Sequence, residues 1–166
     1  AATIALLTVT VVSWVNADYC LNLTYQDADL GMVESAEVYD VGAALARDRV
    51  INEDDSFSVD AVPVFNIALQ RSQTAMNEDE VCDAILGTSG DSIVEATGLY
   101  VDGGFVGAMS SRKELDAVLD KLQKSYGADK NTKTQRVEFV QKLKKTDGLF
   151  PISTLKDSDE MNTGLT

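Results

Sequence analysis

Apolar and polar positions alternate in two short stretches of the chain, and each stretch turns back at a polar centre. The first stretch follows LNLTY and turns at Asp27-Ala28. The second, 76 residues later, follows GLYV and turns at Asp102-Gly103. A period of two is typical of β-strands, and Asp-Gly is a strong signal for a two-residue hairpin turn. The pattern therefore predicts two β-hairpins.

A helical period follows each hairpin. Ser111 and Glu114 form an S-x-x-E capping box in the second copy, and Ser35 stands at the corresponding place in the first. Behind these caps apolar residues recur three and four positions apart, which predicts helices with one buried face. The predicted stripes are Val38, Val41, Ala44 and Leu45 in the first copy, and Leu115, Val118, Leu119 and Leu122 in the second.

A third strand and a short capped helix are predicted to close each copy. Residues 59–65 and 137–143 carry the strand pattern, and Pro63 favours an edge position or a bulge for the first of these strands. Asn77 with Glu80, and Asp157 with Glu160, place a side-chain acceptor at a helix cap and a glutamate three residues later.

The order strand, strand, helix, strand, helix thus occurs twice, although it is common enough to recur by chance. We interpret it as a duplication and predict an α+β protein made of two tandem β-β-α-β-α repeats after an N-terminal hydrophobic helix. The predicted repeats span 18–86 and 93–166, with a linker at 87–92. Because each repeat is small, we expect the pair to pack together or share a sheet.

The first 17 residues carry no charge. A helix of 15 residues spans about 22 Å, which is shorter than a hydrocarbon core of about 30 Å. The segment 1–17 is predicted to be part of a transmembrane helix, or else a signal segment with a cleavage site at Val15-Asn16-Ala17. A buried element is the third alternative, because β-branched residues are frequent in it. Either of the first two would place the rest of the protein outside the cytoplasm, on the extracytoplasmic face of the cell membrane.

Charge argues against nucleic acid as a partner. The net charge is −13, and residues 1–90 contribute 15 acidic and 3 basic side chains to it. Such a surface repels phosphate backbones and anionic membranes. Solubility is the simplest role for this charge.

Several kinds of site lack the residues they need. Histidine is absent, and the two cysteines, Cys20 and Cys82, are too few for a thiolate zinc site. The sequence leaves open whether these cysteines form a disulfide. There is no phosphate-binding G-x-x-x-x-G-K-[ST] motif, and Ser89 has no histidine to activate it. We therefore expect no catalytic, cofactor-binding or metal-binding residues.

Charged clusters leave other chemistry to consider. A glycosidase with two carboxylates could use Asp27 with Asp29, or Asp54 with Asp55, but all four are predicted in turns or loops where a carboxylate is normally solvated. The run 52–55 lacks the spacing and the central glycine of a calcium loop. The only basic cluster, Lys142, Lys144 and Lys145, could contact an anionic wall polymer or simply balance local acids.

The second copy carries short words that point to a known kind of protein. IVEA precedes the hairpin, YVDG forms it with Val106-Gly107, and G-L-F-P precedes the last helix. Together these words resemble the region between the membrane anchor and the LysM or lysostaphin-type zinc metallopeptidase domain of Firmicutes peptidoglycan hydrolases. The first copy departs from the pattern at Gln26-Asp27-Ala28.

The resemblance implies a role in the cell envelope and carries over no catalytic residue. We expect a non-catalytic, membrane-anchored spacer or docking module of a cell-wall hydrolase, with peptidoglycan or envelope proteins as partners. The alternatives are an envelope protein-interaction domain and a carboxylate-dependent glycan hydrolase.

Overall fold

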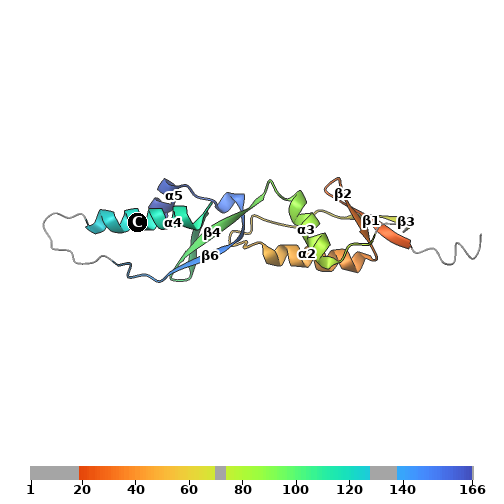
Figure 1. Cartoon of the computed structure of the whole chain (residues 1–166), viewed down its shortest axis with the longest axis horizontal. Helices are drawn as coiled ribbons and strands as arrows, with labels where there is room; N and C mark the ends of the chain where they lie inside the picture. Colours follow the sequence, from red (N-terminus) through yellow and green to blue (C-terminus); the bar gives the residue numbers. More distant parts are fainter. Residues whose placement is uncertain (1–18, 70–73, 128–137, 166) are drawn as a thin grey trace, which may run out of the picture. The chain divides into compact units, whose positions relative to one another are not determined.

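The computed structural model describes residues 19–69, 74–127 and 138–165. This part of the chain is mixed α+β and contains four α-helices and two three-stranded antiparallel sheets. It divides into two compact units (Figure 1). Unit 1 comprises residues 1–47 and 59–88, and unit 2 comprises residues 48–58 and 89–166.

The predicted hydrophobic helix over residues 1–17 lies outside the described residues. Within the described part, no helix is long and apolar enough to cross a bilayer, so the predicted transmembrane helix has no counterpart among these residues. The longest, α4 (Arg112–Gly127), has 16 residues, and charged side chains interrupt its sequence throughout. Its apolar residues form one face that packs on a sheet.

Unit 1 is built on the strand order β2-β1-β3. Its elements in chain order are β1 (Tyr19–Tyr25), β2 (Ala28–Val33), α2 (Ala36–Arg49), β3 (Val64–Leu69) and α3 (Glu78–Thr88). Unit 2 has the strand order β5-β4-β6. Its elements are β4 (Ile93–Val101), β5 (Gly104–Met109), α4, β6 (Leu143–Pro151), the 3₁₀ turn η1 (Ile152–Thr154) and α5 (Ser158–Leu165).

Both predicted hairpins form. Asp102 and Gly103 turn the second with positive φ angles of 52° and 90°, the pattern that favours Asp-Gly. The first turn was predicted one residue too late, because the residues with positive φ are Gln26 and Asp27 while Ala28 already belongs to β2. Aspartate, here Asp27, tolerates such angles better than alanine does.

Each hairpin also contains a register shift at the same place. The shift lies between Leu23 and Thr24 in β1, and between Leu99 and Tyr100 in β4. In β4 the residue opposite Leu99 is Gly107, whose φ of 157° suits a glycine at this irregularity. One extra residue is therefore accommodated on the partner strand in both hairpins.

The third strands lie further along the chain than predicted. β3 begins only at Val64, and Val59 is buried outside any strand. β6 covers residues 143–151, so it begins where the predicted strand was expected to end. It pairs along the whole of β4, from Ile93 opposite Pro151 to Val101 opposite Leu143. This long pairing partner, and not local alternation, determines where β6 lies.

The helix stripes match the sequence in α4 but not in α2. Leu115, Val118 and Leu119 join Leu99, Met109 and Met161 in one core cluster of unit 2. In α2 the buried residues are instead Tyr39, Gly42, Ala43 and Ala46, and Val41 is exposed. A Cβ on Gly42 would lie 2.6 Å from a methyl group of Val81. The small face of α2 therefore packs closely against α3, which rotates the predicted stripe out of the core.

One segment, residues 48–58, precedes β3 in the sequence but belongs to unit 2; we call it the strap. Val50 bridges Leu149 of β6 in parallel, and the Ile51 amide donates to the Leu149 carbonyl at 2.8 Å. The Ile51 side chain covers Gly148, where a Cβ would be 2.7 Å from it. The strap thus covers the outer edge of β6.

Further hydrogen bonds hold the strap. The Asn52 side chain donates to the Phe57 carbonyl at 2.7 Å and accepts from the Phe57 amide at 3.0 Å, which closes a small loop. The Tyr100 hydroxyl donates to Glu53 at 2.9 Å. Burial, followed by this hydrogen bond to a carboxylate, raises the pKa of Tyr100 to about 12.

Candidate functional site

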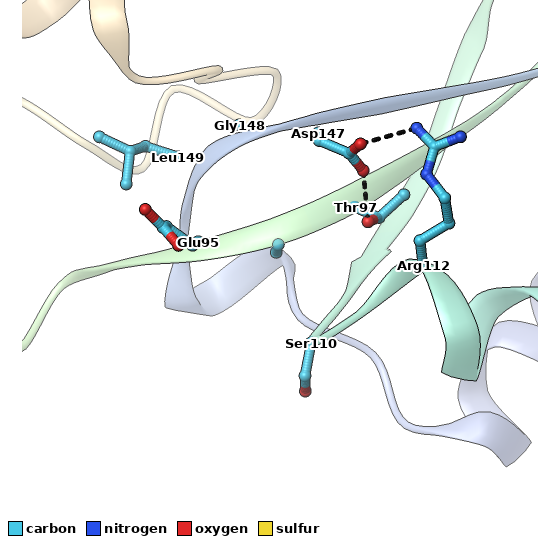
Figure 2. A pocket seen from close by; sticks show the side chains of 8 residues that line it. Glu95, Thr97, Ser110, Arg112, Asp147, Gly148 and Leu149 are labelled. Carbon is cyan, nitrogen blue, oxygen red and sulfur yellow. Dashed lines mark hydrogen bonds and ion pairs between the residues drawn. The ribbon is translucent and has the colours of Figure 1, made fainter.

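A pocket lined by several polar side chains lies at one end of the sheet in unit 2, where α4 begins; we call it the polar pocket. Its volume is about 670 Å³. It is formed by the first half of β4, the connection from β5 to α4, and the second half of β6 (Figure 2). The lining residues are Glu95, Ala96, Thr97, Ser110, Arg112, Asp147, Gly148 and Leu149.

Strand register brings the polar residues together. Thr97 of β4 lies directly opposite Asp147 of β6. Because side chains alternate along a strand, Glu95 and Thr97 share the face of Leu99, which is buried in the core beneath α4. The helix begins at Arg112, close to the Thr97 level of the sheet, so the part of this face nearer Glu95 is left open. Charged residues occupy the opening and apolar residues the covered part.

Asp147 is the centre of a small hydrogen-bond network. The Thr97 hydroxyl donates to one carboxylate oxygen at 2.6 Å, and the Arg112 guanidinium donates to the other at 2.7 Å. Figure 2 shows both side chains converging on Asp147 from β4 and from the start of α4. The hydrogen bond from Thr97, and then that from Arg112, lowers the pKa of Asp147. The carboxylate is therefore held ionised, as a fixed acceptor and not as a proton donor.

Unit 1 has a pocket at the corresponding place, which we call the apolar pocket. Its volume is about 480 Å³. Leu21 of β1 lies opposite Ile67 of β3 here, just as Thr97 lies opposite Asp147 in unit 2. The lining residues are Tyr19, Cys20, Leu21, Glu34, Ser35, Ala36 and Ile67.

The apolar pocket exposes large side chains to solvent. Ile67 is 79% exposed and Tyr19 is 51% exposed. Where Arg112 opens α4 in unit 2, Ala36 opens α2 in unit 1. Among the described residues that line the apolar pocket, Glu34 is the one charged side chain. The two pockets therefore share their backbone setting and differ in chemistry.

The aspartate pairs considered from the sequence line neither pocket. Asp29 accepts a hydrogen bond from the Gly31 amide at 3.1 Å and so supports the first hairpin. Asp54 accepts hydrogen bonds from Ser56 at 2.6 Å and from Ser153 at 3.1 Å. Among the described residues, no group of three or more Asp, Glu or Cys side chains could hold a metal ion.

The basic cluster is dispersed by the strand. Lys145 pairs with Asp116 of α4 on the helix side of the sheet. Lys144 points to the other face, with its ammonium 5.7 Å from the centre of the Tyr100 ring. The Lys142 amide donates to Asp102 at 2.9 Å, next to the hairpin turn. These lysines therefore do not form one continuous surface for a polymer.

The remaining sequence candidates have structural positions. Cys20 and Cys82 are both buried, and no disulfide joins them. The Cys20 thiol lies 3.1 Å from the Met32 sulfur. The Ser89 carbonyl accepts from the Ser92 amide at 2.8 Å just after α3.

Sequence reasoning missed Thr97, Arg112 and Asp147. A signal was present, since Leu143, Lys145, Asp147 and Leu149 alternate with other residues as one face of a strand would. That signal is useful only when residues 143–151 are recognised as a strand opposite β4.

No family model, no curated protein and no solved structure matches this chain.

Proposed function

We propose that this protein is a non-catalytic binding module of the cell envelope, made by duplication of one α+β unit, and that its polar pocket binds peptidoglycan. The observation that carries the proposal is the Thr97–Asp147–Arg112 network at an open, polar end of a sheet.

The duplication is supported by agreement between the units beyond element order. The central strand comes first in sequence in both sheets, and the register shifts at Leu23 and Leu99 are 76 residues apart. The Met76 amide donates to the Met32 carbonyl, and the Lys156 amide to the Ala108 carbonyl, which are matching contacts on the edges of β2 and β5. Agreement at this level of detail favours duplication over chance recurrence of a common element order.

Binding without catalysis is supported by the protonation state of Asp147. A glycosidase needs one carboxyl group whose pKa is raised so that it can act as an acid. The pKa of Asp147 is lowered instead, and its oxygens are engaged by Thr97 and Arg112. The network is suited to hold its geometry and present polar groups.

Peptidoglycan offers the groups that such a surface can recognise. Its sugar hydroxyls and peptide amides can pair with Glu95 and Ser110, and its stem-peptide carboxylates with the outward N–H groups of Arg112. A guanidinium has five N–H donors, so one bond to Asp147 leaves others for a ligand. The resemblance of the second copy to the anchor-proximal region of peptidoglycan hydrolases favours the same ligand.

A sedimentation assay with purified insoluble peptidoglycan tests the proposal. We expect the full chain to pellet with the polymer, and Arg112→Ala to weaken binding about tenfold through loss of a charge-assisted hydrogen bond. Lys113→Ala is the matched control, since it removes the same charge from the next residue of α4, which does not line the pocket. Equal binding by the two variants would contradict the role of the pocket, and release of soluble fragments would contradict the non-catalytic assignment.

A further inference from the structure

The outer edge of the third strand is treated differently in the two units. In unit 2 the strap pairs with β6 at Leu149, the residue opposite Glu95. The matching residue of β3 is Leu69, opposite Tyr19. β3 is an edge strand, and no described segment forms a bridge to its outer side. An edge strand offers backbone N–H and C=O groups to another extended chain.

The apolar pocket lies beside this edge. Ile67 of β3 and Tyr19 of β1 are both largely exposed. Leu21 of β1 lies opposite Ile67 and lines the pocket with both. Exposed large apolar side chains that gather at one pocket are unusual for a surface with no partner. A strand added next to β3 would place every second side chain on the face of this pocket. The edge and the pocket therefore form one surface for an extended segment.

Charge restricts the choice of occupant. Unit 1 contains 11 acidic and 2 basic side chains, and Glu34 lines the apolar pocket itself. A second copy of this chain would bring an equally acidic unit to the surface, which like-charge repulsion disfavours. A segment that carries lysine or arginine among its apolar residues complements the surface instead.

We propose that β3 and the apolar pocket bind an extended segment of a partner protein, apolar at alternate positions and carrying basic residues between them. The segment adds to the sheet next to β3, as the strap adds to β6 in unit 2. Main-chain hydrogen bonds supply affinity in this mode of recognition, and the pocket selects the side chains. This function is separate from polymer binding in unit 2.

An NMR titration of the full ¹⁵N-labelled chain tests the proposal. The probe is an eight-residue peptide in which valine alternates with lysine or threonine, and its counterpart has glutamate in place of lysine. We expect the lysine peptide to shift the amide signals of β3 and of Tyr19, and the glutamate peptide to bind at least about tenfold more weakly.

Two variants locate the binding surface. Ile67→Ser should weaken binding of the lysine peptide about tenfold, because it removes the most exposed apolar side chain of the pocket. Val41→Ser is the matched control, since Val41 is an exposed valine of α2 that does not line the pocket. Both are surface changes, and the thermal melting of each variant checks that it is folded.

Four outcomes would overturn the proposal. The first is that the lysine peptide leaves the β3 amides unshifted. The second is that the lysine and glutamate peptides bind equally, and the third is that Ile67→Ser and Val41→Ser bind the lysine peptide equally. The fourth is that the same amides shift with protein concentration alone, which would assign the surface to a second copy of the chain.

Discussion

The two pockets differ in chemistry while sharing a position. Each lies where the helix after the hairpin begins, between the first part of the central strand and the last part of the third. In unit 2 the facing pair is Thr97 and Asp147, and in unit 1 it is Leu21 and Ile67. Strand register decides which two positions face one another, but it places no demand on their polarity. A pocket of this kind can therefore change its ligand without a change of fold.

The largest effect on the free energy of unfolding is expected from the core beneath the pockets. Leu23 and Leu99 occupy matching positions before the register shifts, and each is 0% exposed. We expect Leu23→Ala and Leu99→Ala each to lower the free energy of unfolding by about 2–5 kcal/mol, because each leaves a cavity. Urea denaturation followed by circular dichroism measures this. If only one of the two variants is destabilised, the two positions are not equivalent.

A smaller effect is expected inside the polar pocket. Thr97 is buried, and its hydroxyl donates to Asp147. Thr97→Val keeps the shape but removes the donor, so we expect a loss of about 1 kcal/mol in the free energy of unfolding. Leu21→Val at the matching position of unit 1 removes no hydrogen bond. A loss of polymer binding in Thr97→Val but not in Leu21→Val would sharpen the difference between the pockets.

The ion pair itself should contribute still less. Arg112 and Asp147 are 52% and 60% exposed, so solvent screens their attraction. A double-mutant cycle with Arg112→Ala and Asp147→Ala should give a coupling free energy below about 1 kcal/mol. A larger coupling would mean that the pair holds the pocket together and does not only present charge.

The titration of Asp147 gives the most delicate test. Its pKa is lowered in the folded state, so its contribution to stability is present above the ordinary pKa of aspartate and is lost as the pH falls through the folded value. NMR titration should show a lower midpoint for Asp147 than for an unfolded aspartate, and Thr97→Val should raise it. In Ile67→Asp the new carboxyl would lie opposite Leu21, which has no hydroxyl to donate as Thr97 does, so its midpoint should lie above that of Asp147.

Local signals in the sequence account for the hairpins and caps. The Asp102-Gly103 turn forms as predicted, and so do the caps: the Asn77 side chain accepts from the Glu80 amide at 2.9 Å, and Asp157 from the Glu160 amide at 2.8 Å. Such features depend on residues close together in the chain, so their pattern is readable without the fold.

Features that depend on distant partners were missed. The lysines and the aspartate of β6 do not indicate a strand in the sequence. Their partners Asp116, Thr97 and Arg112 are distant in the chain, and only the fold brings them together. The strap gives no signal of its own, because its partner Leu149 is about a hundred residues away. The polar pocket inherits both problems, since it is assembled from β4, α4 and β6 together.

The strap also determines where this protein can be divided. A fragment starting at Ser89 would retain every strand and helix of unit 2 yet lose Ile51 and Phe57, which the whole chain supplies from upstream of β3. The edge of β6 at Leu149 would then lack its pairing partner, and the sheet surface at Gly148 would be exposed to water. A fragment that begins at Ser89 would therefore be incomplete and prone to associate through its exposed strand edge. A fragment that begins at Asp48 would keep the strap.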